Sequence, residues 1–291
     1  MRFRWDWLRP VVQAPYVPTI GPVHPSVLTE DLFTDALIAA GTDQRFLRYD
    51  KDIRWSEAKA EHILVEDVVH RPGGTLIPTL SRQGTGTVKV HVYGVEPGST
   101  LAAFELAQKL GAEHGIAKAR VVGFLGPEAS NGRGTRIQLQ NFGRTALPAA
   151  HACVRPFEEW PKSVRDTFAD FAEELTADGF AFLYGQMKAG KAGPVLTAVT
   201  GGKVAGAIGP MEIRPDAIGA PQLMPPYFGV AHGNRGHGLG RCLWRSATRW
   251  GQSHGAAYQL LQSEVGGPAD RLYRSEGLTS LGYVYWQSAT G

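Results

Sequence analysis

The stretch from Phe228 to Gly255, FGVAHGNRGHGLGRCLWRSATRWGQSHG, is the most informative part of this chain. A short apolar run precedes four glycines and two arginines between positions 233 and 241, and a helical pattern follows at once. A loop that enters a helix leaves backbone N–H groups without partners, and the helix dipole adds partial positive charge there. Glycines allow phosphate oxygens to approach that backbone closely. The stretch therefore predicts a phosphate-binding loop between a strand and a helix.

Two common phosphate-binding patterns are missing from this loop. The pattern GxxxxGK[ST] fails because no Lys followed by Ser or Thr stands at the right place. The pattern GxGxxG, counted from Gly236, fails because Arg241 stands where the third glycine is needed. The residues present instead form R-x-x-G-x-G, with Arg235, Gly238 and Gly240 at the defining positions.

This pattern resembles the central motif of the GNAT superfamily of acyl-CoA-dependent N-acyltransferases, in which Q/R-x-x-G-x-G/A joins a strand to a helix. Val230 fits the strand position before the loop, and His232 stands where many members have Pro. In this family the strand and the loop amides bind coenzyme A, and the loop holds its pyrophosphate. The resemblance implies a cofactor-binding set of Phe228, Val230, Arg235, Gly236, His237, Gly238, Leu239, Gly240 and Arg241.

Arg241 opens the expected helix, where the dipole disfavours a cation unless a bound anion reverses the sign. A bound pyrophosphate and an ordinary solvated arginine both remain possible explanations for it.

A second stretch, residues 266–283, resembles the later family pattern N-x-x-A-x-x-L-Y-x-x-x-G-F. Five positions match: Ala269, Leu272, Tyr273, Gly277 and Leu278. Gly266 stands where the family usually has Asn, which puts the hydrogen bond expected there in doubt. The resemblance implies that the Tyr273 hydroxyl donates a proton to the leaving thiolate, a general-acid role, although a tyrosine that only packs its ring is the alternative.

An acceptor amine must lose a proton before it attacks a thioester, so a base is expected near the site. Glu264, at the end of an expected strand, is the chosen candidate, and Glu212 and His232 are the alternatives. The spacing of the histidines and Cys242 in this region suits no zinc motif, and the family needs no metal. No metal site is expected.

Two parts of the chain share one order of elements. Residues 92–122 and 227–261 each combine a strand ending in Gly-Val, a helix ending near His-Gly and an apolar strand. An ancient internal duplication or a chance similarity between two β-α-β units explains this. The expected fold is α/β (α+β): a mixed, mostly antiparallel sheet flanked by helices, of the GNAT type, in two tandem domains. The resemblance implies that residues 1–150 form a degenerate GNAT-like or accessory domain without the loop, having EPGST at 96–100. Residues 163–291 are expected to form the acyl-CoA-binding catalytic domain, with a linker around 145–162.

Hydrophobic periodicity assigns the remaining elements. Helices are expected at 26–41, 100–115, 163–180 and 268–276, and strands include 74–80, 86–95, 119–126, 135–143, 179–186, 194–200, 203–213, 221–230, 256–264 and 281–286.

Composition limits the partners and the setting. The 291 residues carry a net charge of only +3, with no run of basic residues to suggest a nucleic-acid or membrane face. The two cysteines form no CxxC pair and do not suggest a disulfide framework. With no apolar segment long enough to span a membrane, a cytoplasmic protein is expected, as a monomer or homodimer.

Together with the resemblance, this predicts an N-acetyltransferase. It would transfer an acetyl or other acyl group from acetyl-CoA to the amine of a small molecule, such as an antibiotic or another specialised metabolite, by direct attack in a ternary complex. The alternatives are a non-catalytic acyl-CoA-binding or sensing protein, and an acetyltransferase for protein N-termini or lysines.

Overall fold

The structure, a computed structural model, describes residues 3–41, 46–56, 59–94, 96–129, 133–143 and 153–289. The chain forms two compact units that alternate along the sequence. The first unit comprises residues 1–140, 216–218 and 260–291, and the second comprises residues 141–215 and 219–259. The predicted linker at 145–162 lies partly outside the described residues, and the division at 150 and 163 into a loop-free and a catalytic domain stays a prediction.

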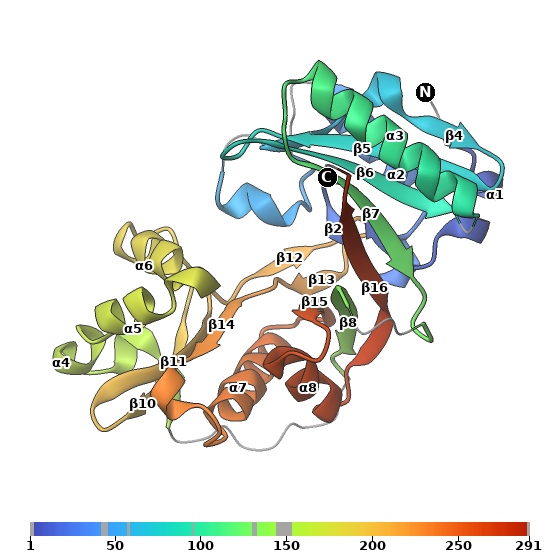
Figure 1. The fold of residues 1–291 in the computed structure, drawn as a ribbon. Helices are drawn as coiled ribbons and strands as arrows, with labels where there is room; N and C mark the ends of the chain where they lie inside the picture. The colour runs from blue at the N-terminus through green and yellow to red at the C-terminus, as the bar shows by residue number, and fades with distance from the viewer. Residues whose placement is uncertain are drawn as a thin grey trace. The chain divides into compact units, whose positions relative to one another are not determined.

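The first unit is built on a long twisted sheet (Figure 1). Its strands follow the order β15-β8-β16-β7-β6-β5-β3, and β4 also pairs with β5. The strands are β3 (Glu61–Ile63), β4 (Val69–Arg71), β5 (Gly74–Ser81), β6 (Thr87–Gly94), β7 (Ala119–Leu125), β8 (Thr135–Asn141), β15 (Tyr258–Glu264, from Leu260 onward) and β16 (Thr279–Ser288). The other elements are α1 (Trp5–Leu8), β1 (Tyr16–Val17), β2 (Gly21–Pro22), α2 (Glu30–Gly41), α3 (Pro97–Glu113) and α8 (Pro268–Ser275).

Helix α3 packs on this sheet because its apolar positions recur at helical spacing. Ala103, Ala107 and Leu110 are fully buried against Val88 and Val90 of the sheet. Alternate residues of a strand point to the same face, so Val88 and Val90 of β6 present one continuous apolar surface to the helix.

The C-terminal strand β16 explains why the units are interleaved. It lies between β7 and β8, with Tyr283 opposite Leu125 and Thr279 opposite Leu139. Strand β8 in turn lies between β16 and β15. The last strand of the chain thus completes a sheet begun by the N-terminal segment, so no single cut in the sequence separates the two units.

The second unit contains a four-stranded sheet in the order β14-β11-β10-β9. Its elements are β9 (Val154–Pro156), α4 (Lys162–Arg165), α5 (Phe168–Glu174), α6 (Phe180–Lys188), β10 (Leu196–Thr200), β11 (Lys203–Gly209), β12 (Ile213–Pro215), β13 (Pro221–Leu223), β14 (Tyr227–Val230) and α7 (Leu239–Ser253). The hairpin β12–β13 pairs with the first two residues of β15, Tyr258 and Gln259.

Two glycines let helices approach both faces of the second unit's sheet. A Cβ at Gly229 would lie 2.6 Å from Phe180 of α6, and a Cβ at Gly206 would lie 2.8 Å from Leu243 of α7. Gly206 pairs with Val230, one position from Gly229, so the two contacts fall on opposite faces. The sheet is therefore covered by α5 and α6 on one face and by α7 on the other, as Figure 1 shows.

The strand predicted at 179–186 is wrong, because these residues form α6. Phe180 and Leu183 are fully buried three residues apart, which matches a helical period, and Tyr184 and Met187 pack against the same core. The aromatic content favoured a strand locally, but packing against α5 decided the helix. The single helix predicted at 163–180 is also broken, into α4, α5 and a 3-10 turn that ends at Gly179, whose φ of +87° terminates it.

The predicted fold class, a mixed and mostly antiparallel sheet flanked by helices, is confirmed. Strands β6 and β7 run parallel, as do β13 and β15, whereas β5–β6, β7–β16, β8–β16 and β10–β11 are antiparallel.

Candidate functional site

The site begins on β14, which is the edge strand of its sheet. The N–H of Ala231 donates to the Ala205 carbonyl at 2.9 Å, which fixes the alternation of hydrogen bonds along β14 and β11. In an antiparallel pair, every second residue directs its N–H and C=O away from the partner strand. The residues so directed are Phe228 and Val230, whose main-chain groups therefore face the open edge.

The loop that follows is shaped by two left-handed glycines. A 3-10 turn, His232–Asn234, ends at Arg235, and Gly236 and Gly238 then adopt φ of +83° and +80°. A side chain in this region is strained, so glycine is required at both positions. A Cβ at either would meet no atom within 4 Å, and both residues are exposed. The space above the loop backbone is therefore open.

The N–H groups of the loop end and of the first two residues of α7 find no acceptor among the described residues. The first hydrogen bond of the helix runs from the Cys242 N–H to the Gly238 carbonyl, at 3.1 Å. Across the described residues, no oxygen accepts from the N–H groups of residues 236–240. Five consecutive donors, at the positive end of a 15-residue helix, form a site suited to an anion.

Arg235 and His232 brace the loop from its entry side. Arg235 Nε donates to the Val230 carbonyl at 3.0 Å. The Glu174 carboxylate accepts from the backbone N–H of His232 at 2.5 Å and lies 2.7 Å from its Nδ1. These two hydrogen bonds from His232 lower the pKa of Glu174. Because Nδ1 of His232 faces Glu174, Nε2 is the ring nitrogen that faces solvent, and the side chain is 61% exposed.

All nine residues of the predicted cofactor set lie on β14, the loop and the first turn of α7, and so come together in the second unit. Arg241 is exposed. The alternative base Glu212 lies in the same unit and forms an ion pair with Arg214, at 2.5 Å.

Tyr273 and Glu264, the predicted catalytic pair, belong to the first unit. Tyr273, on α8, is buried, and burial raises the pKa of its hydroxyl well above the usual value, so the group stays protonated across the neutral range. Glu264 is the last residue of β15 and is exposed.

Helix α8 is anchored by a buried ion pair that the sequence did not reveal. Asp270, fully buried, accepts from Arg136 Nε at 2.7 Å and from the Gly266 N–H at 3.0 Å. The guanidinium also donates to the Tyr283 hydroxyl. Arg136 lies 134 positions from Asp270, and no local pattern connects them. The ion pair fixes the turn before α8, and α8 carries Tyr273.

In the corresponding β-α-β segment of the first unit, the described residues (92–94 and 96–122) form no such site. Helix α3 begins with Pro97, which has no N–H, and no glycine loop precedes it. Strands β6 and β7 pair only as far as His91 and Val122. Beyond that point the Tyr93 ring stacks on Phe124 at 4.9 Å, and the Tyr93 hydroxyl donates to the Tyr16 carbonyl at 2.7 Å. The Tyr16 backbone and the Tyr93 and Phe124 rings therefore meet beyond the last paired residues of β6 and β7.

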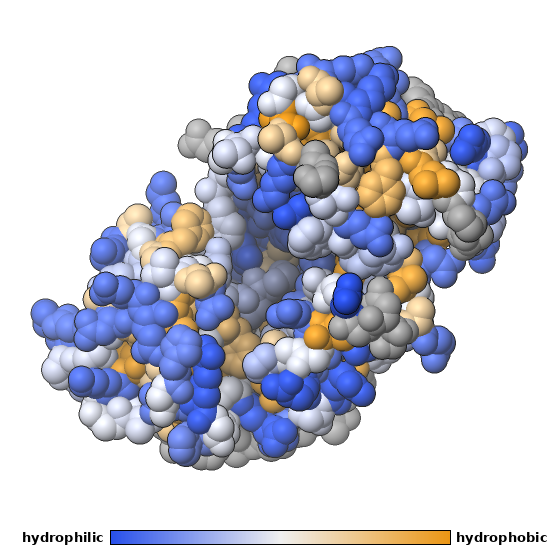
Figure 2. All heavy atoms as spheres, viewed as in Figure 1, coloured by the Kyte–Doolittle hydropathy of each residue, from blue (hydrophilic) through white to orange (hydrophobic). Residues whose placement is uncertain are grey.

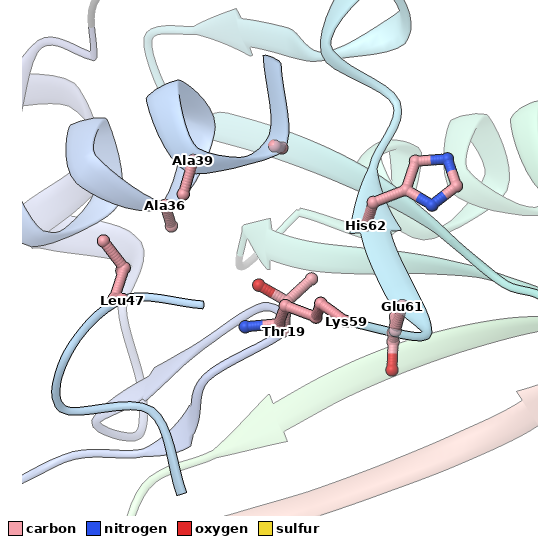
Figure 3. Close-up of a pocket in the computed structure, with 8 residues that line it drawn as sticks. Thr19, Ala36, Ala39, Leu47, Lys59, Glu61 and His62 are labelled. Carbon is pink, nitrogen blue, oxygen red and sulfur yellow. The ribbon is translucent and has the colours of Figure 1, made fainter. Parts of the chain in front are cut away.

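A cavity in the first unit is too small for a substrate. Its volume is about 10 Å³, enough for about one water molecule. Figure 3 shows Ala36 and Ala39 of α2 lying across it from Thr19 and Lys59, with Glu61 and His62 on β3 at one side.

Among the described residues, no group of three or more His, Cys, Asp or Glu side chains could hold a metal ion. No described helix is both long and apolar enough to cross a membrane. Most of the surface visible in Figure 2 is hydrophilic.

Comparison with known proteins gives distant structural matches only. No protein-family profile matches the chain, and no curated protein sequence matches it. Solved structures that resemble it include GNAT acetyltransferases. A GCN5-related N-acetyltransferase from Sphaerobacter thermophilus is 15% identical, with a TM-score of 0.49, over 74% of this chain and 77% of that one. A tandem GNAT protein from the clavulanic acid biosynthesis pathway is 15% identical, with a TM-score of 0.49, over 90% and 95%.

A further match is a GCN5-related N-acetyltransferase from Kribbella flavida, 18% identical with a TM-score of 0.44, over 83% of this chain and 95% of that one. At such identities and TM-scores, the function has to follow from this chain's own residues.

Proposed function

We propose that this protein is an acyl-CoA-dependent N-acyltransferase that transfers an acetyl group from acetyl-CoA to the amine of a small molecule. The observation that carries the proposal is the run of five N–H groups at residues 236–240, which have no acceptor in the described part of the chain and lie under open space. The R-x-x-G-x-G pattern of the same loop supports an acyl-CoA ligand over other phosphate compounds.

The residues present fit coenzyme A on two counts. The loop N–H groups and the α7 dipole would hold the pyrophosphate, and the outward main-chain groups of Phe228 and Val230 would hydrogen-bond the amides of the pantetheine arm, as an edge strand pairs with a neighbour. The bound thioester supplies the activated acyl group. Arg235, which bonds the Val230 carbonyl, fixes the junction between these two regions.

Proton movements fall to side chains of this chain. The Tyr273 hydroxyl would donate a proton to the departing thiolate, and its raised pKa keeps the hydroxyl protonated and able to donate. Glu264 would take the proton from the acceptor amine, directly or through water, and its exposure leaves the carboxylate open to the amine. Direct attack in a ternary complex needs no covalent enzyme intermediate, so loop and strand act by orientation.

Two measurements test the proposal. Calorimetric titration of acetyl-CoA should show binding to the full-length protein. Coenzyme A release should then rise above the buffer rate when a panel of primary amines is added. Binding without release to any amine would favour the non-catalytic acyl-CoA-binding alternative, and release only with peptides would favour a protein acetyltransferase. Absence of binding would refute the proposal.

A further inference from the structure

A cavity of about 340 Å³ opens in the second unit, outside the glycine loop. It lies between Phe157 after β9, helix α4, the second half of α6, and residues 192–193 before β10. None of its described lining residues belongs to β14, the glycine loop or α7. Its volume falls within the range of small-molecule sites. The cavity therefore has room for a ligand that the proposed function does not use.

The floor of this cavity is apolar and preformed. Phe157, Tyr184 and Met187 line it and pack on the buried core of the unit. The Phe157 ring meets the fully buried Phe168 ring edge-on, with ring centroids 5.2 Å apart, and the Tyr184 centroid lies 5.4 Å from the same ring. Because both rings contact one fully buried partner, the apolar surface is in place before a ligand binds.

Two cations line the cavity without a carboxylate partner among the described residues. Arg165, on α4, is half-buried, and its buried Nε has no hydrogen-bond partner in the described part of the chain. Nζ of Lys188 lies 4.5 Å from the centre of the Tyr184 ring and within ion-pair distance of no described carboxylate. A buried N–H without an acceptor costs free energy, which a bound anion would recover.

The other charged side chains of the cavity leave room for one negative charge. Lys162 and Asp166 neutralise each other in an exposed ion pair, at 2.7 Å. Glu158, the other carboxylate, is exposed. The described lining thus holds three cations and two carboxylates, a net charge of +1. A monoanion would balance it.

We propose that this cavity is a binding site for a small amphipathic carboxylate, a monoanion with an aromatic or branched aliphatic body. The body would lie on Phe157, Tyr184 and Met187, and the carboxylate would face Arg165 and Lys188. The planar guanidinium group matches the geometry of a carboxylate better than that of other small anions of one charge. The inference does not rest on acyl transfer, because no lining residue has a part in that reaction.

The test titrates phenylacetate into the isotope-labelled, full-length protein and follows the backbone amides by nuclear magnetic resonance. The amide signals of Ala192 and Gly193 should shift and saturate, with a Kd of about 1 mM or tighter for a ligand of this size. Phenylacetamide, which keeps the ring but lacks the charge, and acetate, which keeps the charge but lacks the ring, should each bind at least about tenfold more weakly. Phenyl phosphate, a dianion, should bind no more tightly than phenylacetate.

Variants test the two cations. Arg165→Met and Lys188→Gln should each weaken phenylacetate binding about tenfold or more, because each removes a charged donor to the carboxylate. Lys203→Gln is the matched control, since Lys203 is an exposed cation of the same unit, on β11, that does not line the cavity. It should bind phenylacetate like wild type. Denaturant unfolding of each variant shows whether its fold is retained.

Four results would overturn the proposal: no saturable shift, shifts scattered outside the cavity, equal affinity for phenylacetamide, or wild-type affinity in Lys188→Gln and Arg165→Met. Tighter binding of phenyl phosphate would overturn the carboxylate class. Because Lys188 is exposed, its variant is expected to fold and decides the outcome even if Arg165→Met unfolds. Acetyl-CoA binding is measured separately, so either proposal can fail without the other.

Discussion

Replacing Gly238 by Trp should separate the loop's binding role from its structural role. Gly238 adopts φ of +80°, and its Cβ position opens to solvent. The indole would therefore project over the loop without a clash in the protein and occupy the space through which an anion approaches. We expect the variant to fold and to lose most of its affinity for acetyl-CoA.

The size of the loss follows from the five N–H groups. A hydrogen bond to a charged group contributes about 1.5–3 kcal/mol. If the indole denies a phosphate two of the five, binding weakens by at least about 3 kcal/mol, or more than about 100-fold in Kd. The left-handed backbone costs a side chain about 1–2 kcal/mol of folding stability. A control variant with a similar loss of stability is therefore needed, so that lost stability is not mistaken for lost binding.

Gly190 provides the control. It lies in the same unit after α6, has φ of +67° and also has open space at its Cβ position. Gly190→Trp should lose comparable stability in denaturant unfolding but bind acetyl-CoA like wild type in calorimetry. If both variants fold and bind with the wild-type Kd, the loop does not hold the cofactor and the reasoning fails.

Three other predictions concern catalysis and stability. Tyr273→Phe should lower kcat about 100-fold with little change in KM, if its hydroxyl is the general acid, and an unchanged kcat would leave it a packing residue. Asp270→Ala should lower the free energy of unfolding in chemical denaturation by about 3 kcal/mol or more, because it leaves the buried Arg136 charge without its partner. Asp166→Ala, at an exposed ion pair, should lower it by less than about 1 kcal/mol. Equal losses would show that Asp270 does not anchor α8. Full burial lowers the pKa of His91 to about 4. Between about pH 6.5 and pH 4, His91 is therefore protonated in the unfolded state but neutral in the folded state. The free energy of unfolding has its full value above about pH 6.5 and falls by about 3 kcal/mol as the pH drops to 4. His91→Leu should flatten this acid limb of a stability-against-pH curve, and an unchanged limb would show that other groups cause it.

Sequence patterns predicted the structure most accurately where it depends on the local backbone conformation. The glycine loop, the helix after it and the strand before it were all predicted, because positive φ, free N–H groups and apolar periodicity are properties of neighbouring residues. Residues 179–186 show the limit of such reasoning. Their aromatic content suits a strand in isolation, but they fold as α6 because Phe180 and Leu183 pack into the core beside α5.

The sequence by itself therefore determined the glycine loop before the helix and the class of sheet, since both depend on residues close along the chain. Only the tertiary structure decided two pairings: Glu174 with His232, and Arg136 with Asp270. Each joins residues at least 58 positions apart. Such pairs form only when strands and helices pack against one another. Local sequence patterns do not indicate which distant side chains this packing brings into contact.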